Sequence, residues 1–476
     1  MQSLRGFFSV KNMVPGEAEA TLPSNREAYM NYLNLAIPSV LESVLVTLIG
    51  TIDTAMVGGL GAEAIAAVGL VGQPRMLMLC IFMALNVGIT AVVARRKGEE
   101  RPDAANATMR TGLVVCGALS LVMMIVAQLV AEPLMYFAGA QADTIVDATD
   151  YFRITMSVLP LNVLSLAICA AQRGVGNTRL TMVVNVSSNL LNVLFNYFLI
   201  NGVGPFPRLE VRGAAIATAM GFTFGFILSM ISLIAPKARM SFLHLSRHDR
   251  WIPDKESIGA IGKVGGNAII EQLAMRFGFF SYAKIVAGLG TMVFASHQVC
   301  IQFLNISFGF ADGLAVGATS LVGQMLGRKE PKLAHMYGKM AQRFAMVVGV
   351  VLGAIVILFR TPLVGLFTAD PEVIRLSSVV MICVGLFQPF QTQAIVNSGA
   401  LRGAGDTRYV AKVMLITTSV VRPLAALIAV QVISGIFHLP EWALVGAWMA
   451  SLLDIFIRLS LTNRRFNGGK WHEIKV

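Results

Sequence analysis

Long apolar stretches alternate with short polar ones along the 476 residues of the chain. Each apolar stretch is roughly 20 residues or longer, the length that an α-helix needs to cross the ~30 Å hydrocarbon core of a bilayer. Because lipid-exposed backbone must form its hydrogen bonds within its own segment, stretches of this length that contain Gly and Pro are expected to be helices and not barrel strands. The predicted spans cover about 33–57, 63–94, 104–130, 149–172, 180–201, 213–235, 258–287, 291–326, 333–359, 374–401, 409–434 and 442–462. The pattern predicts an all-α polytopic membrane protein with twelve transmembrane helices.

A motif that occurs twice indicates that the chain consists of two copies of one unit. Residues 173–180 are Arg-Gly-Val-Gly-Asn-Thr-Arg-Leu, and residues 402–409, 229 positions later, are Arg-Gly-Ala-Gly-Asp-Thr-Arg-Tyr. The same offset holds without a gap back to the first span. It pairs Glu42 with Glu271, Leu60 with Leu289, Gly88 with Gly317, Thr90 with Thr319 and Pro102 with Pro331.

The repeat predicts two pseudo-symmetric six-helix lobes, at 33–236 and 258–463. A polar cytoplasmic linker at 237–257 is expected to join them. The remaining residues, 1–32 and 464–476, are predicted to be cytoplasmic tails.

Charge sets the orientation and argues against a nucleic-acid-binding protein. Charged residues make up 13% of the chain, about half of the ~25% found in soluble domains, against 55% apolar residues. The net charge of +12 comes from Lys and Arg that gather in the tails and in alternate loops, such as 95–97, whereas one long opposite loop carries Glu132, Asp143, Asp147 and Asp150. Since positive loops stay on the cytoplasmic side, both termini are predicted to be cytoplasmic. We expect a multi-pass protein of the cell membrane that contacts lipid and no nucleic acid.

The first predicted span carries two acidic residues and a proline. Pro38 removes one helical hydrogen bond and clashes with the preceding turn, so it predicts a bend. Glu42 and Asp53 are eleven residues apart, and at 100° per residue they return to within about 20° of one face. Both carboxylates are therefore expected on the same stripe, roughly 16 Å apart.

A carboxylate inside a bilayer needs a specific reason, because its insertion costs at least ~2.5–3.5 kcal/mol. For Asp53, two interpretations are open: a site that alternates between protonated and ion-bound states, or an interfacial residue near a helix end. For Glu42 and Glu271, the repeat allows the two carboxylates to face each other across a central cleft and to favour a cationic solute. The alternative is that each forms a structural ion pair with an arginine such as Arg75 or Arg276.

Other polar residues within spans have local expectations. The fifth span carries an amide stripe that either binds another helix or lines a cavity, formed by Asn185, Asn189, Asn192 and Asn196. Asp312 is expected to pair with Arg276 or Lys284. On the last span, Asp454 is expected to pair with Arg458, four residues later.

The duplicated motif predicts a helix–turn–helix connection on the cytoplasmic side. Its glycines suit the left-handed conformation that ends a helix, and Asn177 or Asp406 suits the cap of the helix that follows. Its arginines are long enough to reach lipid phosphates. A well-capped turn is thus sufficient to explain the motif.

Catalytic and metal-binding patterns are missing from the sequence. It has no HExxH, GxSxG or P-loop motif. The five cysteines lie within predicted spans without CxxC spacing, so they are expected to be reduced and structural. We expect no enzymatic activity, no metal site and no cofactor.

A set of motifs resembles those of the multidrug and toxic compound extrusion (MATE) transporters. The matching stretches, in order along residues 37–410, are Ile37-Pro38 with Glu42, Asp53 to Gly61, Asn86 to Gly88, Ala94 to Glu99, Gln172 to Arg179, His297-Gln298, Gly323 to Gly327 and Leu401 to Arg408. The resemblance implies a V-shaped pair of six-helix lobes that exports organic cations and other amphipathic drugs in exchange for H⁺ or Na⁺.

The resemblance also implies roles for individual residues. Asp53 would belong to an ion site in the N-terminal lobe, with Asn192, Asn196 and Thr218 as polar partners. The most studied branch of the family has an acid at the position of Asn196, so this chain lacks one titratable group. Pro38 is placed where the first helix of the family bends.

The predicted substrate-binding residues are Glu42, Glu271 and Gln391. The first two follow from the repeat, and Gln391 stands where another branch of the family has an acid on helix ten. The helix-seven acid of that branch lies deeper than Glu271, so the chain is not assigned to that branch.

We expect a monomer that moves small cationic or amphipathic molecules by alternating access. Because the sequence has no ATP-binding motif, the energy is expected to come from an H⁺ or Na⁺ gradient unless a separate subunit supplies it. The main alternative is a flippase for lipid-linked precursors, since Arg75, Arg276 and Lys284 could grip a pyrophosphate. A passive channel and a membrane-embedded enzyme are alternatives from different classes.

Overall fold

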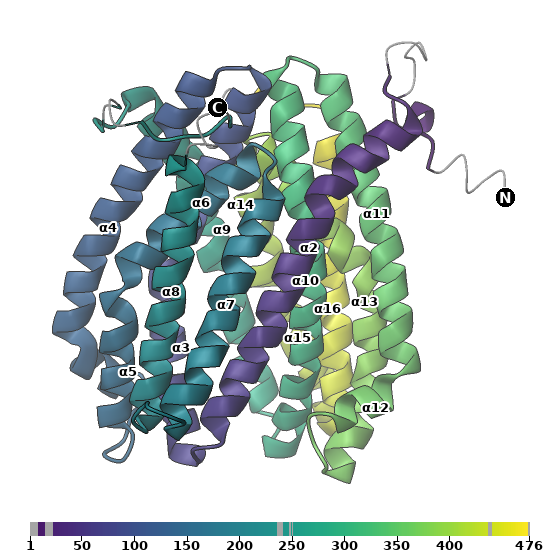
Figure 1. Ribbon diagram of the computed structural model, residues 1–476. Helices are drawn as coiled ribbons and strands as arrows, with labels where there is room; N and C mark the ends of the chain where they lie inside the picture. The colour runs from purple at the N-terminus through teal and green to yellow at the C-terminus, as the bar shows by residue number, and fades with distance from the viewer. Residues whose placement is uncertain are drawn as a thin grey trace. The chain divides into compact units, whose positions relative to one another are not determined.

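The computed structural model describes residues 8–14, 22–235, 241–246, 249, 251–436 and 440–474, and their regular structure is helical (Figure 1). The first copy of the repeat follows the short turn η1 (Val10–Met13) and comprises α2 (Asn25–Gly58), α3 (Ala62–Gly98), α4 (Pro102–Phe137), α5 (Ile145–Ser157), α6 (Leu159–Gly174), α7 (Thr178–Asn201) and α8 (Glu210–Ile234). The second copy comprises α9 (Lys255–Ala287), α10 (Thr291–Gly327), α11 (Pro331–Leu358), α12 (Arg360–Gly365), α13 (Pro371–Gly403), α14 (Thr407–Ile416), the π-helical turn η4 (Thr417–Val421), α15 (Arg422–Val430), the π-helical turn η5 (Gln431–Ile436) and α16 (Pro440–Asn467).

The helices confirm the predicted fold class. Within the described residues, ten helices are long and apolar enough to cross a bilayer, and the bent pair α5–α6 provides an eleventh. The remaining predicted span corresponds to α9, which has 33 residues and carries Glu271, Arg276 and Lys284. The repeat is maintained in the helix boundaries, because α3 and α10 both have 37 residues and begin 229 positions apart.

Two prolines have different effects on their helices. The fourth predicted span is broken at Val158, where α5 and α6 meet with a bend of 50°. Pro160 lies in the first turn of α6, where its missing N–H and its ring prevent a continuous helix from α5. Pro38, in contrast, lies inside α2, which continues as one helix for 34 residues.

Packing divides the chain into two compact units, Leu41–Gly266 and Met1–Val40 together with Asn267–Val476. The units do not begin where the predicted lobes begin, at 33 and 258. The reason is that the first turns of α2 pack with the second copy, whereas the first turns of α9 pack with the first copy.

The exchanged turns make equivalent contacts in the two units. A Cβ atom on Gly88 of α3 would lie 2.8 Å from the backbone oxygen of Ile261 in α9. Gly317 of α10, at the matching position, lies against Tyr32 and Ala36 of α2, and the Tyr32 hydroxyl donates to the Leu314 carbonyl oxygen at 3.0 Å. Both glycines allow two helices to approach closely, which is the packing role of small residues in membrane helices.

Candidate ion and substrate sites

The structure brings Asp53 together with the three polar residues predicted around it, all within the unit Leu41–Gly266. The Asn196 side chain in α7 donates to Asp53 Oδ1 in α2. With its amide nitrogen toward Asp53, Asn192 donates to the same oxygen at 3.2 Å, and its own oxygen accepts from the Thr218 backbone amide of α8 at 3.1 Å. This orientation of Asn192 satisfies both ends of its amide group. Asp53 is therefore held by neutral donors.

Two residues that the sequence did not assign to this cluster lie beside it. Tyr151 of α5 shares a hydrogen bond with Thr218, and the charge of Arg75 in α3 acts on both Asp53 and Tyr151. The Arg75 guanidinium lies 5.0 Å from the centroid of the Phe222 ring, a cation–π distance. The sequence could have indicated Arg75, because an arginine in the middle of an apolar span is unusual. Nothing in the sequence distinguished Tyr151.

One buried atom at the Asp53 cluster has no hydrogen-bond partner within the described residues. It is Oδ1 of Asn196, whose side chain is fully buried. A buried carbonyl oxygen is costly when it accepts no hydrogen bond. The cluster therefore has an acceptor available next to the carboxylate.

Glu42 lies on the same face of α2 as Asp53, as the spacing predicts, and it also contacts α7. It accepts hydrogen bonds from Asn185 at 2.6 Å, from Thr181 at 2.8 Å and from Arg173 at 3.2 Å. Three of the four asparagines in the stripe thus bind acids on α2, and Asn189 donates to the Asn185 carbonyl oxygen of its own helix at 2.8 Å. The amide stripe serves helix–helix binding.

Glu271 forms the matching ion pair in the other unit. Arg402 donates through Nη2 to Glu271 Oε1 and through Nε to Glu271 Oε2, the latter at 3.3 Å. The two residues are 131 positions apart, the same separation as Glu42 and Arg173. The structural ion pairs considered from the sequence are therefore present, but their partners are the arginines of the duplicated motif and not Arg75 and Arg276. These arginines bind carboxylates where the sequence suggested lipid phosphates.

The duplicated motif ends each helix as predicted but begins the next helix differently. Gly176 and Gly405 adopt left-handed φ values of 90° and 84°. Neither Asn177 nor Asp406 caps the following helix through its side chain. Asn177 donates instead through its side-chain nitrogen to Gln172 Oε1 at 3.2 Å, and Asp406 accepts from Arg465 at 2.6 Å, so that a guanidinium from α16 binds the carboxylate that would cap the helix.

Gln391 belongs to a buried charged cluster in the second copy. Its Oε1 accepts from Arg458 at 2.7 Å, and Arg422 binds Asp454 through Nη2 at 2.7 Å and through Nε at 2.8 Å. The predicted Asp454–Arg458 pair is wrong as the direct contact, because Arg422 arrives from α15 and occupies the carboxylate.

Asp312 also has different neighbours from those predicted. The charges of Arg402 and Glu271 act on it, and not those of Arg276 or Lys284. Asp312 thus lies within electrostatic range of the Glu271–Arg402 pair.

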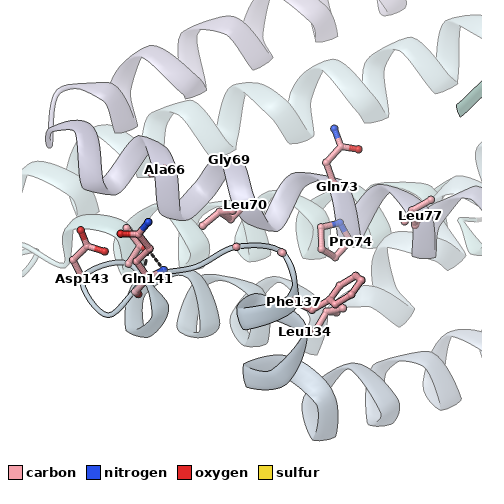
Figure 2. A pocket seen from close by; sticks show the side chains of 13 residues that line it. Ala66, Gly69, Leu70, Gln73, Pro74, Leu77, Leu134, Phe137, Gln141 and Asp143 are labelled. Atoms are coloured by element: carbon pink, nitrogen blue, oxygen red, sulfur yellow. Dashed lines mark hydrogen bonds between the residues drawn. The ribbon is translucent and has the colours of Figure 1, made fainter. Parts of the chain in front are cut away.

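A cavity of about 720 Å³ lies apart from these residues, between α3 and the α4–α5 connection. Figure 2 shows Leu70 and Pro74 of α3 and Phe137 of α4 along its wall, with Asp143 at one end. Within this connection, the Gln141 backbone N–H donates to Thr144 Oγ1 at 3.1 Å. None of the predicted site residues lines this cavity.

The sequence matches a family model called MatE over residues 38–198 and 268–428, one segment in each copy of the repeat. Together the two segments cover more than half of the chain. The chain belongs to the MatE family. MatE proteins are membrane transporters, so this MatE chain is a transporter and not an enzyme.

Relatives with curated names match the MatE chain over most of their length. It is 28% identical over 471 residues to the "probable multidrug resistance protein NorM" of Thermotoga maritima, covering 98% of this chain and 97% of the relative. It is 27% identical over 383 residues to the "multidrug resistance protein PmpM" of Pseudomonas aeruginosa, covering 79% and 78%.

Solved MatE structures share the fold. A MOP superfamily transporter from Pyrococcus furiosus has a TM-score of 0.84 and 20% identity, with 93% of this chain and 97% of that chain covered. The Vibrio cholerae MATE transporter VcmN has a TM-score of 0.83 and 19% identity, with 94% and 99% covered. At this identity the match defines the twelve-helix, two-lobe architecture of the MatE chain and nothing of its substrates.

Proposed function

We propose that this chain is a secondary-active antiporter that exports organic cations and other amphipathic drugs in exchange for H⁺ or Na⁺. It acts as a monomer in the cell membrane, with both termini in the cytoplasm. Relatives from Thermotoga maritima and Pseudomonas aeruginosa that are named multidrug resistance proteins support the substrate class.

The single observation that supports ion coupling at Asp53 is the chemistry of its partners. Glu42 and Glu271 each pair with an arginine, whereas Asp53 is held by the amides of Asn192 and Asn196. An arginine already neutralises a carboxylate, so a proton or Na⁺ would have to displace it. A carboxylate that accepts from amides keeps a charge that H⁺ or Na⁺ neutralises directly.

The unpartnered Oδ1 of Asn196 fits the same role. When Asp53 is protonated, its O–H becomes a donor, and this oxygen is a neighbouring acceptor. When Na⁺ binds, the carboxylate and amide oxygens are suitable ligands. Either ion would therefore satisfy a polar atom that is otherwise buried without a partner.

The substrate is proposed to bind at Glu42, Glu271 and Gln391 as the protein alternates between two states. A cationic substrate competes with Arg173 for Glu42 and with Arg402 for Glu271. Each ion pair thus keeps its glutamate partnered until a cationic substrate replaces the arginine, and the pair forms again when the substrate leaves. Ion binding at Asp53 then resets the cycle.

The test measures export of ethidium, a fluorescent organic cation, from proteoliposomes under separately imposed H⁺ and Na⁺ gradients. Asp53→Asn is expected to abolish gradient-driven transport, because the amide cannot exchange a proton or neutralise Na⁺. The matched control is Asp103→Asn, which changes an exposed aspartate in the first turn of α4 and should leave transport unchanged. Full transport by Asp53→Asn at equal protein level would remove Asp53 from the coupling mechanism.

A flippase for lipid-linked precursors is the second candidate. The buried cluster of the second copy favours it, since Arg422 and Arg458 face one carboxylate, Asp454. An excess of guanidinium groups suits a pyrophosphate. Translocation of a fluorescent lipid-linked pyrophosphate in vesicles, which Arg458→Gln should impair, with no ethidium export by the wild type, would favour this candidate.

A further inference from the structure

A second cavity, of about 530 Å³, lies in the unit formed by Met1–Val40 and Asn267–Val476, and neither Glu271 nor Arg402 of that unit lines it. One wall is the first half of α11. The other walls are η1, Gln393 of α13 and Asn467 at the end of α16. The volume is in the range of small-molecule sites in proteins.

The α11 wall carries two cationic side chains and a histidine in a row. His335, Lys339 and Arg343 are spaced four residues apart, which places them on one face of the helix. All three are half-buried. Among the described residues that line the cavity, none is acidic. The site therefore attracts an anion.

An uncharged donor on the same wall also lacks a partner. Gln342 is 6% exposed and lines the cavity, and its Nε2 has no hydrogen-bond partner within the described residues. A buried N–H group that donates to nothing destabilises the fold unless a ligand accepts from it. Gln342 therefore points to a ligand with acceptor oxygens.

Contacts of η1 and of the residues at the end of α16 hold the remaining walls in place. Arg343 donates to the Asn12 carbonyl oxygen at 3.3 Å, which attaches η1 to α11. The His335 ring stacks on Phe466 with ring centroids 5.0 Å apart, and the fully buried Trp471 donates to the Phe466 carbonyl oxygen at 2.7 Å. The cavity is thus a built site and not a space between mobile side chains.

An exposed apolar stripe continues from the basic row along α11. Met346 lines the cavity and is 42% exposed, Val350 follows one turn later at 50%, and Val347 and Val351 lie beside them at 41% and 52%. With 28 residues, α11 is roughly 42 Å long, about 12 Å more than a ~30 Å hydrocarbon core. With this excess at its first end, α11 places His335 and Lys339 at the headgroup level. Arg343, roughly 18 Å from Pro331, lies just inside the hydrocarbon, from where its long side chain reaches the headgroups, and the stripe fits the acyl chains.

We propose that this cavity binds the phosphate of an anionic phospholipid, with Lys339, Arg343 and the Gln342 amide on the headgroup and the Met346–Val350 stripe on one acyl chain. A basic pocket between helices at the edge of the hydrocarbon is a known means of holding such headgroups. A free phosphate would use the same basic groups, but it would leave the apolar stripe without a role.

The test uses the purified full-length chain in detergent and counts bound lipids by native mass spectrometry. Phosphatidylglycerol should bind more tightly than phosphatidylcholine. Lys339→Gln and Arg343→Gln should each weaken phosphatidylglycerol about fivefold, the factor for one basic residue near an anionic lipid surface, and the double variant roughly 25-fold. Gln342→Met, which keeps volume and charge, should weaken it by less.

The matched control is the double variant Lys332→Gln with Arg464→Gln, which removes two exposed charges near the same ends of α11 and α16. It should bind phosphatidylglycerol as the wild type does. Displacement of the lipid by millimolar inorganic phosphate would identify a free-phosphate site and overturn the lipid assignment. Wild-type affinity in the Lys339→Gln/Arg343→Gln double variant would also overturn it.

Discussion

The two copies of the repeat share one ion pair and differ in their buried polar clusters. Glu42–Arg173 and Glu271–Arg402 are the same interaction at an offset of 229 residues, with the same separation of 131 positions. The Asp53 cluster has no such counterpart. The position that matches Asp53 is Tyr282, which packs in the apolar core of the second copy.

The difference holds for the partners as well. The offset of 229 places Val421, Ala425 and Ala447 at the positions of Asn192, Asn196 and Thr218. In the reverse direction, it places Val193, Gly225 and Ser229 at the positions of Arg422, Asp454 and Arg458. Each copy thus has a polar cluster where the other has apolar or small residues.

This comparison separates what the two copies share from what only one of them has. The shared ion pair joins the hairpin of the duplicated motif to α2 in the first copy and to α9 in the second. The two copies differ in the partners of a carboxylate. Asp53 accepts from neutral amides, whereas Asp454 faces two guanidinium groups. Ion coupling at one site would require such a difference.

The largest expected effect is on Asp454, which is fully buried. Asp454→Asn leaves Arg422 without its carboxylate, and breaking a buried ion pair costs about 3–5 kcal/mol. We expect a large drop in the thermal denaturation midpoint, measured by size-exclusion chromatography of the heated detergent-solubilised protein. Glu372→Gln, at an exposed position of α13, should leave the midpoint unchanged. A stable Asp454→Asn variant would mean that this cluster is not a structural one.

A smaller effect is expected at the shared ion pair, and it should differ between the copies. Glu271→Gln replaces the two charge-assisted hydrogen bonds of Arg402 by at most one neutral hydrogen bond and turns an amide NH2 toward the guanidinium, for a loss of about 2–3 kcal/mol in the stability of the fold. Glu42→Gln should cost less, about 1–2 kcal/mol, because the amide oxygen can still accept from Asn185 while the amide nitrogen donates to the Thr181 hydroxyl oxygen.

Charge exchange provides the control for this pair. Glu271→Arg combined with Arg402→Glu should restore part of the decrease in the thermal denaturation midpoint, whereas either change alone should not. Equal losses for Glu271→Gln and Glu42→Gln would show that Thr181 and Asn185 contribute nothing to the first pair.

The helices and the shared face of α2 could be predicted from the sequence because they depend on local periodicity, and the repeat could be predicted because its motif recurs at a constant offset of 229 residues. Spacing alone placed Glu42 and Asp53 on one face, and both contact α7. The arginine partners of Glu42 and Glu271 depend on how a hairpin folds back over 131 positions, which periodicity does not encode. The equal separation in the two copies was a usable signal.

The errors have a common physical cause. Local rules predicted an Asp454–Arg458 pair and helix caps at Asn177 and Asp406. Arginines distant in sequence, Arg422 and Arg465, bind the two aspartates instead, and Asn177 donates to Gln172, five residues earlier. Buried acceptors bind the strongest donor that packing brings to them, and for Asp454 that donor is Arg422 from another helix.

The smallest expected effect on stability is at the two glycines, Gly88 and Gly317, that pack against the first turns of α9 and α2. Gly88→Ala would place a Cβ atom 2.8 Å from the Ile261 backbone oxygen, and backbone cannot move away cheaply, so we expect a loss of about 1–2 kcal/mol. At the matching position, Gly317→Ala would meet the Tyr32 ring at 3.1 Å and the Ala36 methyl group at 3.3 Å.

A side chain such as that of Tyr32 can shift by a few tenths of an ångström, and alanine gains ~0.5–1 kcal/mol of helix propensity over glycine. Gly317→Ala should therefore be close to neutral in the thermal denaturation midpoint, while Gly88→Ala lowers it. Gly50→Ala, where a Cβ atom meets nothing within 4 Å, reports the propensity gain alone. If Gly88→Ala matched Gly50→Ala in stability, α3 and α9 would not pack as closely as the backbone contact at Ile261 requires.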